Sequence, residues 1–295
     1  MRFDQTQIAV RERAMLDIFD IALHVTRVFA WPLLVTFSFG VVPLMLFNYL
    51  LIGWMTDIAY EEQFPYRYLW NMMLLVYIEA SLASVFATCF LGQAVFHERP
   101  KLRQLLADVT KLFPHIAWCQ LFLRVVVPVW VLYLFVDRDY EWAGVIELLF
   151  VPALALYVLG MRSFRPFINE IIVLERNPLR SRDPQTQSVG VRSSRLHGPA
   201  SGELFARSFG SFFIGVLLWM AFYGMFLFIS SVFFNEWRQR EFMVTWCYPL
   251  SLWMVVLYFT VVNFLSYLDV RIRQEGWEVE LQLRAEAARL TSKLI

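Results

Sequence analysis

Long apolar runs alternate with short polar stretches along most of the chain. A helix needs about 20 largely apolar residues to cross the ~30 Å hydrocarbon layer of a bilayer. Six runs have this length, at 31–53, 69–94, 115–136, 144–163, 211–234 and 244–268. The pattern therefore predicts an all-α integral membrane protein with six transmembrane helices.

A similar short element precedes three of these runs. It reads "VTRVF" at 25–29, "VTKLF" at 109–113 and "ARSF" at 206–209. Upstream of the first two, in 1–30 and near 100–113, apolar residues recur at helical spacing, which is typical of helices that lie in the headgroup plane. We interpret the chain as three repeats of an interfacial helix plus a transmembrane hairpin. A general preference of membrane entries for a cation beside an aromatic residue would produce the same pattern.

The remaining segments complete the predicted organisation. The first four transmembrane helices fall within 31–175, and the fifth and sixth within 203–268. Residues 176–202 are rich in Ser, Pro, Gly and Arg without periodicity, so they are expected to form a mobile cytoplasmic linker. Residues 269–295 are expected to form a cytoplasmic amphipathic helix.

The composition excludes several classes of protein. With 59% hydrophobic and 17% charged residues and a mean hydropathy of +0.53, the chain carries more apolar surface than one soluble core could bury. Its net charge of +1 does not favour nucleic acid. The three cysteines lie in apolar stretches and the four histidines are scattered, so we expect no metal site, no redox chemistry and no cofactor.

The positive charges predict the topology. Most of the 26 Lys and Arg residues lie in the N-terminal region, the second and fourth loops and the C-terminal tail. By the positive-inside rule, these segments and both termini are cytoplasmic. The expected location is the inner, or plasma, membrane, in a multi-pass arrangement.

Two ionisable residues are expected near the middle of the membrane. Glu79 lies about 10 residues into the second span and Arg124 about 9 residues into the third, which places both at a similar depth. They form a candidate ion pair that would hold the two spans in register, or a candidate substrate or proton path. Snorkelling to an interface is a further alternative. Glu147 lies about one turn inside the fourth span and is expected to reach the outer membrane–water interface, on the side away from the cytoplasm.

The C-terminal tail has two apolar strips when it is read as a helix. The second strip is the candidate surface for a partner or for docking on the protein itself, and it consists of Trp277, Leu281, Ala285 and Ala288. Opposite charges four apart, such as Asp269 and Arg273, favour the helix. The protein's own interfacial helices or a partner helix would cover this strip.

Three stretches resemble one group of bacterial membrane proteins. They are "FINEIIVLERNPLRS" at 167–181, "ARSFGSFF" at 206–213 and "YLDVRIRQEGWEVEL" at 267–281. These are similar to the six-span membrane domain that accompanies glycerophosphoryl diester phosphodiesterases. In that group, a glutamate corresponding to Glu175 is closely followed by a cation and serine corresponding to Arg207 and Ser208, whereas this chain inserts a polar linker. No phosphodiesterase barrel is present, so the resemblance does not imply hydrolysis.

The function that the sequence favours is a non-enzymatic scaffold or an accessory subunit of a membrane complex. No HExxH motif, Gly-x-Ser-x-Gly elbow or phosphate-binding glycine loop is present, so an enzyme is not expected. The alternative is a small transporter or permease subunit that uses Glu79 and Arg124. In either case, the expected partners of the protein are the lipid bilayer and a membrane or cytoplasmic protein, and not nucleic acid.

Overall fold

The computed structural model describes residues 14–59, 65–94, 102–136, 144–179, 187–235 and 241–275. Within these ranges the chain is helical and contains no strand, which confirms the predicted all-α class. In chain order the elements are α1 (Met15–Val28), α2 (Ala30–Ile52), α3 (Trp54–Ala59), α4 (Tyr66–Ala83), α5 (Val85–Ala94), α6 (Leu102–Ile116), η2 (Ala117–Leu123), α7 (Val126–Leu134), η3 (Ile146–Phe150), α8 (Val151–Phe164), α9 (Ile168–Leu174), α10 (Val189–His197), α11 (Ser201–Phe234), η4 (Met243–Cys247) and α12 (Tyr248–Glu275). The η elements are π-helical turns.

Five helical stretches in the described part of the chain are long and apolar enough to cross a membrane. They are Ala30–Ile52, Tyr66–Ala94, Ile146–Phe164, Ser201–Phe233 and Met243–Gln274. The pair Pro114–Phe122 and Val126–Leu134 would make a sixth if it counts as one span, but it is bent by 56°. The long apolar helices indicate a membrane protein, and they coincide with the runs that the sequence predicts because span length follows directly from the length of an apolar run.

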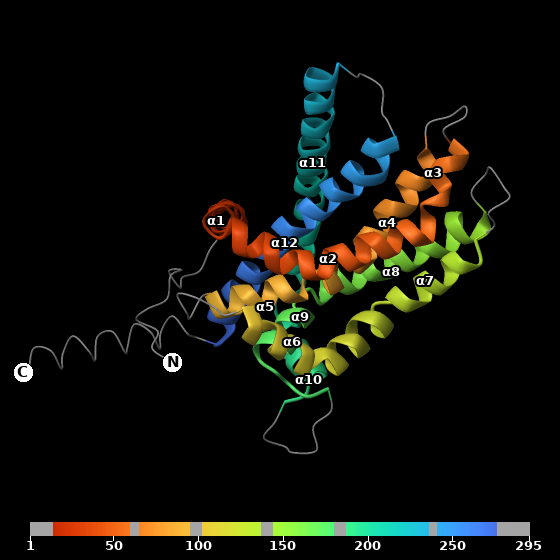
Figure 1. The fold of residues 1–295 in the computed structure, drawn as a ribbon. Coiled ribbons are helices and arrows are strands. Elements are labelled where there is room, and N and C mark those ends of the chain that lie inside the picture. The colour runs from red at the N-terminus through yellow and green to blue at the C-terminus, as the bar shows by residue number, and fades with distance from the viewer. Residues whose placement is uncertain are drawn as a thin grey trace, which may run out of the picture.

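The second apolar run, α4 followed by α5, lies at the centre of the bundle. Helix α4 packs against α2, α7, α8 and α12, and α2, α4, α7 and α8 run alongside one another (Figure 1). Buried residues make up 83% of the most apolar window of this run. One end of the bundle, where α2 and α7 finish and α4 and η3 begin, is called the hairpin end below. The opposite end, where α1 begins and α12 finishes, is called the terminal end.

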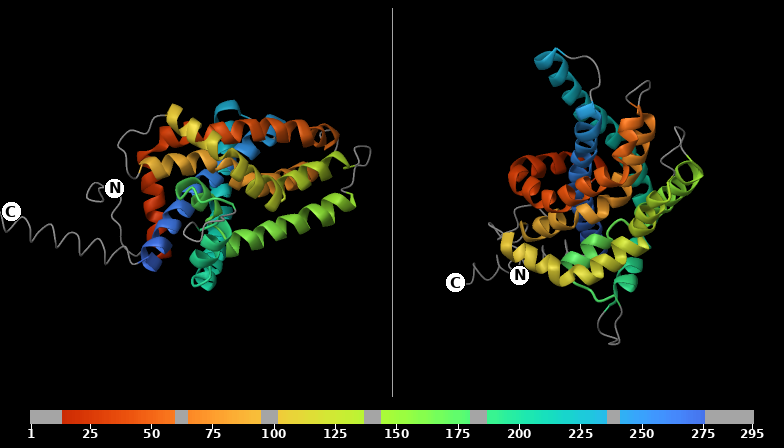
Figure 2. Two further views of the ribbon diagram at one scale, coloured as in Figure 1. Left: turned by 90° about the horizontal axis from the view of Figure 1, so that it is seen from below. Right: turned by 45° about the vertical axis from the view of Figure 1, so that its right-hand side comes forward.

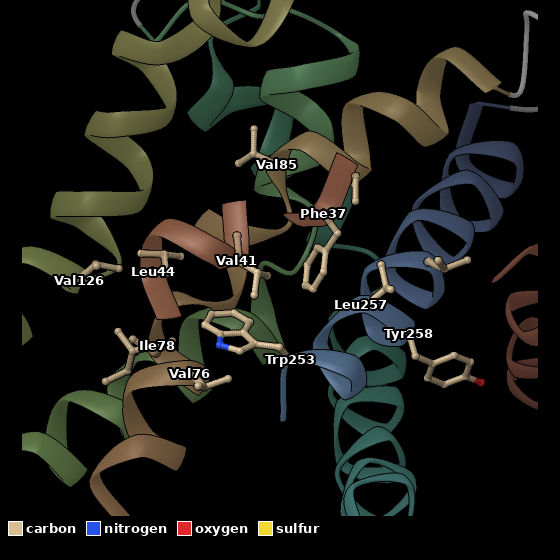
Figure 3. Close-up of a cluster of buried hydrophobic side chains, with 14 of the residues drawn as sticks. Phe37, Val41, Leu44, Val76, Ile78, Val85, Val126, Trp253, Leu257 and Tyr258 are labelled. Carbon is tan, nitrogen blue, oxygen red and sulfur yellow. The ribbon is translucent and has the colours of Figure 1, made fainter. Parts of the chain in front are cut away.

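Helix α12 packs against the other spans through large aromatic side chains. Figure 3 shows Trp253 of α12 beside Val41 and Leu44 of α2 and close to Val76 of α4. Trp253 is 1% exposed, and its ring meets the ring of Phe37 edge to face at 6.4 Å. Such aromatic packing adds about 0.5–1.5 kcal/mol to the burial of the ring area itself. At its other end α12 packs against α1 (Figure 2).

The two central spans approach closely because one contact residue is glycine. A Cβ atom added to Gly40 of α2 would collide with the backbone of Ala83 at the end of α4. Glycine and alanine at a helix interface let two backbones come together, and this van der Waals contact is a main source of stability between membrane helices. Gly40 therefore sets the spacing between α2 and α4.

Helix α11 is the most exposed of the apolar helices. Its most apolar window has no buried residue, and its upper part stands clear of the other helices (Figure 1). Large apolar side chains along it point outward, among them Phe212, Leu217, Met220 and Phe228. An apolar surface of this extent is stable in contact with lipid chains and not in contact with water.

The structure differs from the sequence-based organisation at two places. Within the expected linker 176–202, residues Val189–His197 form α10, which packs against α9 and buries Val189 and Leu196. The "ARSF" element lies inside α11, without the break that separates α1 from α2. Ser188 explains the first difference in part, because its side chain caps the first turn of α10.

The amphipathic tail is only partly described. Helix α12 continues without interruption from the sixth span to Glu275, and the predicted Asp269–Arg273 pair forms at 2.9 Å. The strip formed by Trp277, Leu281, Ala285 and Ala288 lies outside the described residues.

Replacing Gly40 with alanine should destabilise the protein by about 1–3 kcal/mol, because the new methyl group forces α2 away from α4. The matched control is Gly160→Ala in α8, where an added Cβ meets no atom within 4 Å. That change should be neutral or slightly stabilising, because alanine favours a helix over glycine by about 1 kcal/mol. Thermal unfolding of both variants in the same detergent measures the difference. Equal melting temperatures for the two variants would contradict the close contact.

Candidate functional site

A cluster of polar side chains is buried at the hairpin end. Arg67 of α4 holds Glu147 of η3 through its Nε, at 3.1 and 3.0 Å to the two carboxylate oxygens, and through Nη2, at 2.6 Å to Oε1. Asn71 donates to Glu147 at 2.8 Å and accepts from the hydroxyl of Tyr133 at 2.7 Å. Glu147 is fully buried. Its charge is compensated by a bidentate arginine, the strongest form of this pair.

Glu79 lies in the middle of its span and is held by neutral donors. It is fully buried. The amide of Asn48 in α2 donates to Oε2 at 2.7 Å, and the indole N–H of Trp130 in α7 donates to Oε1 at 2.6 Å. Among the described residues no cation forms an ion pair with it. A carboxyl group at this depth, without a compensating charge, is costly and marks a candidate functional position.

A third cluster lies toward the terminal end of α4. Asn169 of α9 donates to the carbonyl oxygen of Ser81 at 2.6 Å and to the hydroxyl of Ser84 at 3.0 Å, and it accepts from the amide of Gln120. Arg162 of α8 approaches the carbonyl oxygen of Ile78 at 3.4 Å. Its guanidinium also lies 4.6 Å from the centre of the Tyr77 ring. This cation is therefore stabilised by an aromatic face and a backbone dipole.

The structure does not bring Glu79 and Arg124 together as an ion pair. Arg124 ends the π-helical turn η2, and its Nη2 donates to the carbonyl oxygen of Arg165 at 3.4 Å. The residue of the third span that reaches Glu79 is Trp130, six residues beyond Arg124, or about 9 Å along a helix. Counting residues places Arg124 too deep, because the span is bent by 56° just after it.

Together the three clusters form a polar track along α4. From Arg67 to Ser84 the helix rises by about 25 Å, close to the ~30 Å thickness of the hydrocarbon layer. The partners come from α2, α7, η3, α8 and α9, so the track winds around α4 and does not follow one face. Within the described residues this is the set of buried polar groups that follows the length of a span.

Charged residues also meet where the terminal end joins α10. Glu175, at the end of α9, accepts from Arg192 of α10 at 2.6 and 2.7 Å and from the hydroxyl of Tyr267 in α12 at 2.7 Å. Burial raises the pKa of Glu175, but the hydrogen bonds from Arg192 and Tyr267 outweigh this effect and bring the pKa below its usual value. Helix α10 therefore supplies a cation that holds Glu175, and Arg271 of α12 lies 3.8 Å from the same carboxylate.

A second group of charged side chains at the terminal end joins α11 to α12. Arg207 contacts Asp269 at 2.8 Å and Glu203 at 2.6 Å, and Arg273 contacts the same two carboxylates at 2.9 Å each. Ser208 lies 3.0 Å from Ser163, hydroxyl to hydroxyl. The motifs that carry the family resemblance thus lie together here, although Glu175 is not paired with Arg207.

His197 at the end of α10 is buried and has two defined partners. Its Nε2 accepts from the backbone N–H of Phe167 at 3.2 Å, and its Nδ1 lies 2.7 Å from the carbonyl oxygen of Ser193. These partners fit the neutral ring with the proton on Nδ1, because a protonated Nε2 could not accept. Burial lowers the pKa of His197 to about 4, assisted by the charges of Arg165 and Arg124 and opposed by the Ser193 hydrogen bond.

Several residues of the track are missed by sequence reasoning. Asn48 and Trp130 hold Glu79, and Asn71 and Tyr133 complete the hairpin-end cluster. The detectable signal is an uncharged polar residue inside an apolar run, as at Asn48 and Asn71. Their partners depend on how each helix is rotated, which a linear pattern does not contain.

Comparison of the chain with protein-family models, with curated proteins and with solved structures gives no match. Among the described residues, no group of three or more His, Cys, Asp or Glu side chains is placed to hold a metal ion. The chemistry of the site is therefore argued from its own geometry.

Acidification should destabilise the protein through His197. The unfolded chain takes up a proton as the pH falls below about 6.5, whereas the folded ring stays neutral until about pH 4. The stabilisation is present above the first value and is lost as the pH falls toward the second, by up to about 3 kcal/mol. The measurement is the difference in unfolding free energy between the wild type and His197→Gln. This difference should shrink between about pH 7.5 and about pH 4.5, and a constant difference would show that His197 does not titrate in this way.

Proposed function

We propose that this protein is a membrane transporter or permease component in which the polar track along α4 carries protons or small polar solutes. The observation that supports this most directly is Glu79, a fully buried carboxyl group in the middle of a span, whose hydrogen-bond partners among the described residues are Asn48 and Trp130. Ionisable residues at this depth are rare, and they commonly line ion and substrate paths.

The broken third span supports the same proposal. Val125 adopts a left-handed backbone conformation, with φ 55°, directly after Arg124. This conformation is costly for a β-branched residue, and such strain gathers at functional sites. Interrupted helices whose irregular backbone is buried inside the protein are a recurrent feature of transporters. The break lies beside the terminal-end cluster of the track, because Gln120 belongs to both.

Around this track we infer the finer organisation that the sequence predicts. The bent pair counts as one span, which makes six, and three units of interfacial helix plus hairpin build the bundle. The termini are cytoplasmic, and the amphipathic helix after 268 continues into the cytoplasm. The protein belongs in the inner membrane of a bacterium, in the group of six-span domains that its terminal-end motifs resemble. It is not an enzyme.

The scaffold hypothesis is the alternative, since every cluster described above can also be structural. In that case the Arg67–Glu147 pair and the Glu79 hydrogen bonds would only fix helix rotation. In Glu79→Gln the amide oxygen can accept from Trp130, and the NH2 group can donate to Oδ1 of Asn48, which has no partner among the described residues, once the Asn48 amide turns over. A purely structural role therefore survives this change at small cost. The two hypotheses therefore differ in what Glu79→Gln does, because the amide keeps the shape and loses the proton-binding group.

The test is flux through vesicles of phosphatidylcholine and phosphatidylglycerol that contain the purified full chain. Proton flux is measured with a trapped pH-sensitive dye, and flux of small neutral solutes by osmotic swelling with glycerol. We expect the wild type to exceed protein-free vesicles in at least one assay and Glu79→Gln to lower that flux toward the protein-free level. The carboxyl group of Glu241 is exposed and outside the track, so Glu241→Gln is the matched control and should keep wild-type flux.

Circular dichroism and gel filtration of each variant establish that the protein is folded. A folded wild type without flux in either assay would overturn the transporter proposal and leave the scaffold hypothesis. Unchanged flux in folded Glu79→Gln would show that Glu79 does not take part.

A further inference from the structure

Three buried side chains at the terminal end of the track each leave one polar atom without a hydrogen-bond partner. These atoms are Oε1 of Gln120, Nε of Arg124 and Oε2 of Glu170, and the three side chains belong to residues that are at most 3% exposed. Buried polar groups are satisfied in the great majority of cases, so an unsatisfied donor and two unsatisfied acceptors in one place need an explanation.

The three residues lie where η2 meets the start of α9. Gln120 donates to Asn169, the residue before Glu170, and Arg124 donates to the carbonyl oxygen of Arg165, shortly before α9. The positive charge of Arg124 acts on the carboxyl group of Glu170 and lowers its pKa, yet no ion pair joins these two side chains within the described residues. The cluster therefore holds an acid and a base that are near one another and incompletely engaged.

The backbone around Arg124 has features of a mobile joint. The π-helical turn η2 precedes it, Val125 with its left-handed φ of 55° follows, and the two halves of the span meet at 56°. Straightening this joint would relieve the strain at Val125 and displace the guanidinium of Arg124. π-Helical turns and strained residues commonly lie where a helix changes shape during function.

The surroundings of Glu170 favour exchange of a proton in the neutral pH range. Burial raises the pKa of Glu170 to about 7, while a hydrogen bond from its own backbone N–H and the charge of Arg124 act in the opposite direction. The titratable and charged side chains on the elements around α9 have partners of their own or face solvent, except His115, whose buried Nδ1 has no hydrogen-bond partner within the described ranges. These are Cys89 of α5, Arg103, Asp108, Lys111 and His115 of α6, Arg162 of α8, Arg192, Arg195 and His197 of α10, and the neighbouring Arg165 and Glu175.

We propose that Glu170 is a proton-binding site at the terminal end of the track and that its protonation state controls the joint at Arg124. This proposal rests on the proposed transport function and gives it a coupling ion. A proton from water adds to the carboxylate of Glu170 and produces a neutral carboxylic acid. Arg124 then loses the attraction of a nearby negative charge and is free to move with the joint. When the proton leaves, the charge on Glu170 draws the guanidinium back.

The direct test is infrared difference spectroscopy of the purified full chain in phosphatidylcholine vesicles, stepped between about pH 5 and about pH 9 around the pKa of Glu170. The carboxylic acid C=O band of Glu170 should disappear with a midpoint near neutral pH. It should be absent from Glu170→Gln and retained in Glu79→Gln, the matched change in the middle of the track. Arg124→Gln should shift the midpoint to higher pH, because it removes a charge that stabilises the carboxylate.

A second readout connects the proton to the joint. Cysteine-free protein carrying one spin label at position 122 and one at position 131, both exposed, reports the distance across the break. We expect this distance to change over the same pH range as the infrared band. Glu170→Gln should fix it at the low-pH value, because the amide resembles the protonated acid, and Glu170→Asp should restore pH dependence.

These measurements separate the two proposals, because neither requires transport. A titrating band that persists in the folded double variant Glu79→Gln, Glu170→Gln, or a distance that does not depend on pH, would overturn the proton-controlled joint even if flux is present. A titrating band and a pH-dependent distance in protein without flux would support the joint and overturn the transport function alone.

Discussion

A polar side chain that is withdrawn from water inside an apolar bundle must find its hydrogen-bond partners on neighbouring helices, and α4 carries many such groups. Arg67, Asn71, Glu79, Ser81 and Ser84 each have a partner on another element. An unsatisfied polar group in this setting costs several kcal/mol. Helix α4 can therefore occupy only the central position, where α2, α7, η3, α8 and α9 all surround it. The arrangement of the other spans follows from this requirement.

The same requirement explains why the packing and the polar track depend on one another. Gly40 lets α2 approach α4, and Asn48 lies about two turns further along α2 on the side that reaches Glu79. Trp253 packs beside Val41 and Leu44 of α2 and close to Val76 of α4. Glu79 is fully buried, and the low polarity around it strengthens its hydrogen bonds and raises the cost of breaking them. The joint near Arg124 combines a strained backbone with buried polar atoms that have no partner in the described part of the chain, whereas in the middle of the track Oδ1 of Asn48 likewise lacks a partner there but the backbone is helical. The terminal end is thus the part of the track with the more adaptable backbone.

How much the sequence reveals depends on whether a feature is local. The apolar runs, the helical class and the Asp269–Arg273 pair are local, and the structure agrees with each of them. The partner of Glu79 is not local, because it depends on helix rotation and on the bend after Arg124. Glu147 shows the same limit, since its place about one turn inside its span does not reveal that Arg67 from another span binds it. Helix α10 is not evident from periodicity because its nine residues bury their apolar side chains against a neighbour and do not form a long amphipathic pattern.

The structure explains why the end of α12 is charged: its charged side chains bind neighbouring helices at the terminal end, where α9, α10, α11 and α12 meet. Asp269 and Arg273 lie on the same side of the helix, one turn apart, and both engage α11 through Arg207 and Glu203. Tyr267 engages Glu175, which Arg192 of α10 also holds. The charges that directly follow the last apolar run are therefore used within the protein to join α9, α10, α11 and α12. Phe167 directly precedes α9, and its ring packs against His197 of α10 and Tyr267 of α12. The junction therefore sets the position of α9 against the joint at Arg124. The terminal-end motifs thus have a physical reason to occur together: they hold the element that carries the proposed proton-binding residue.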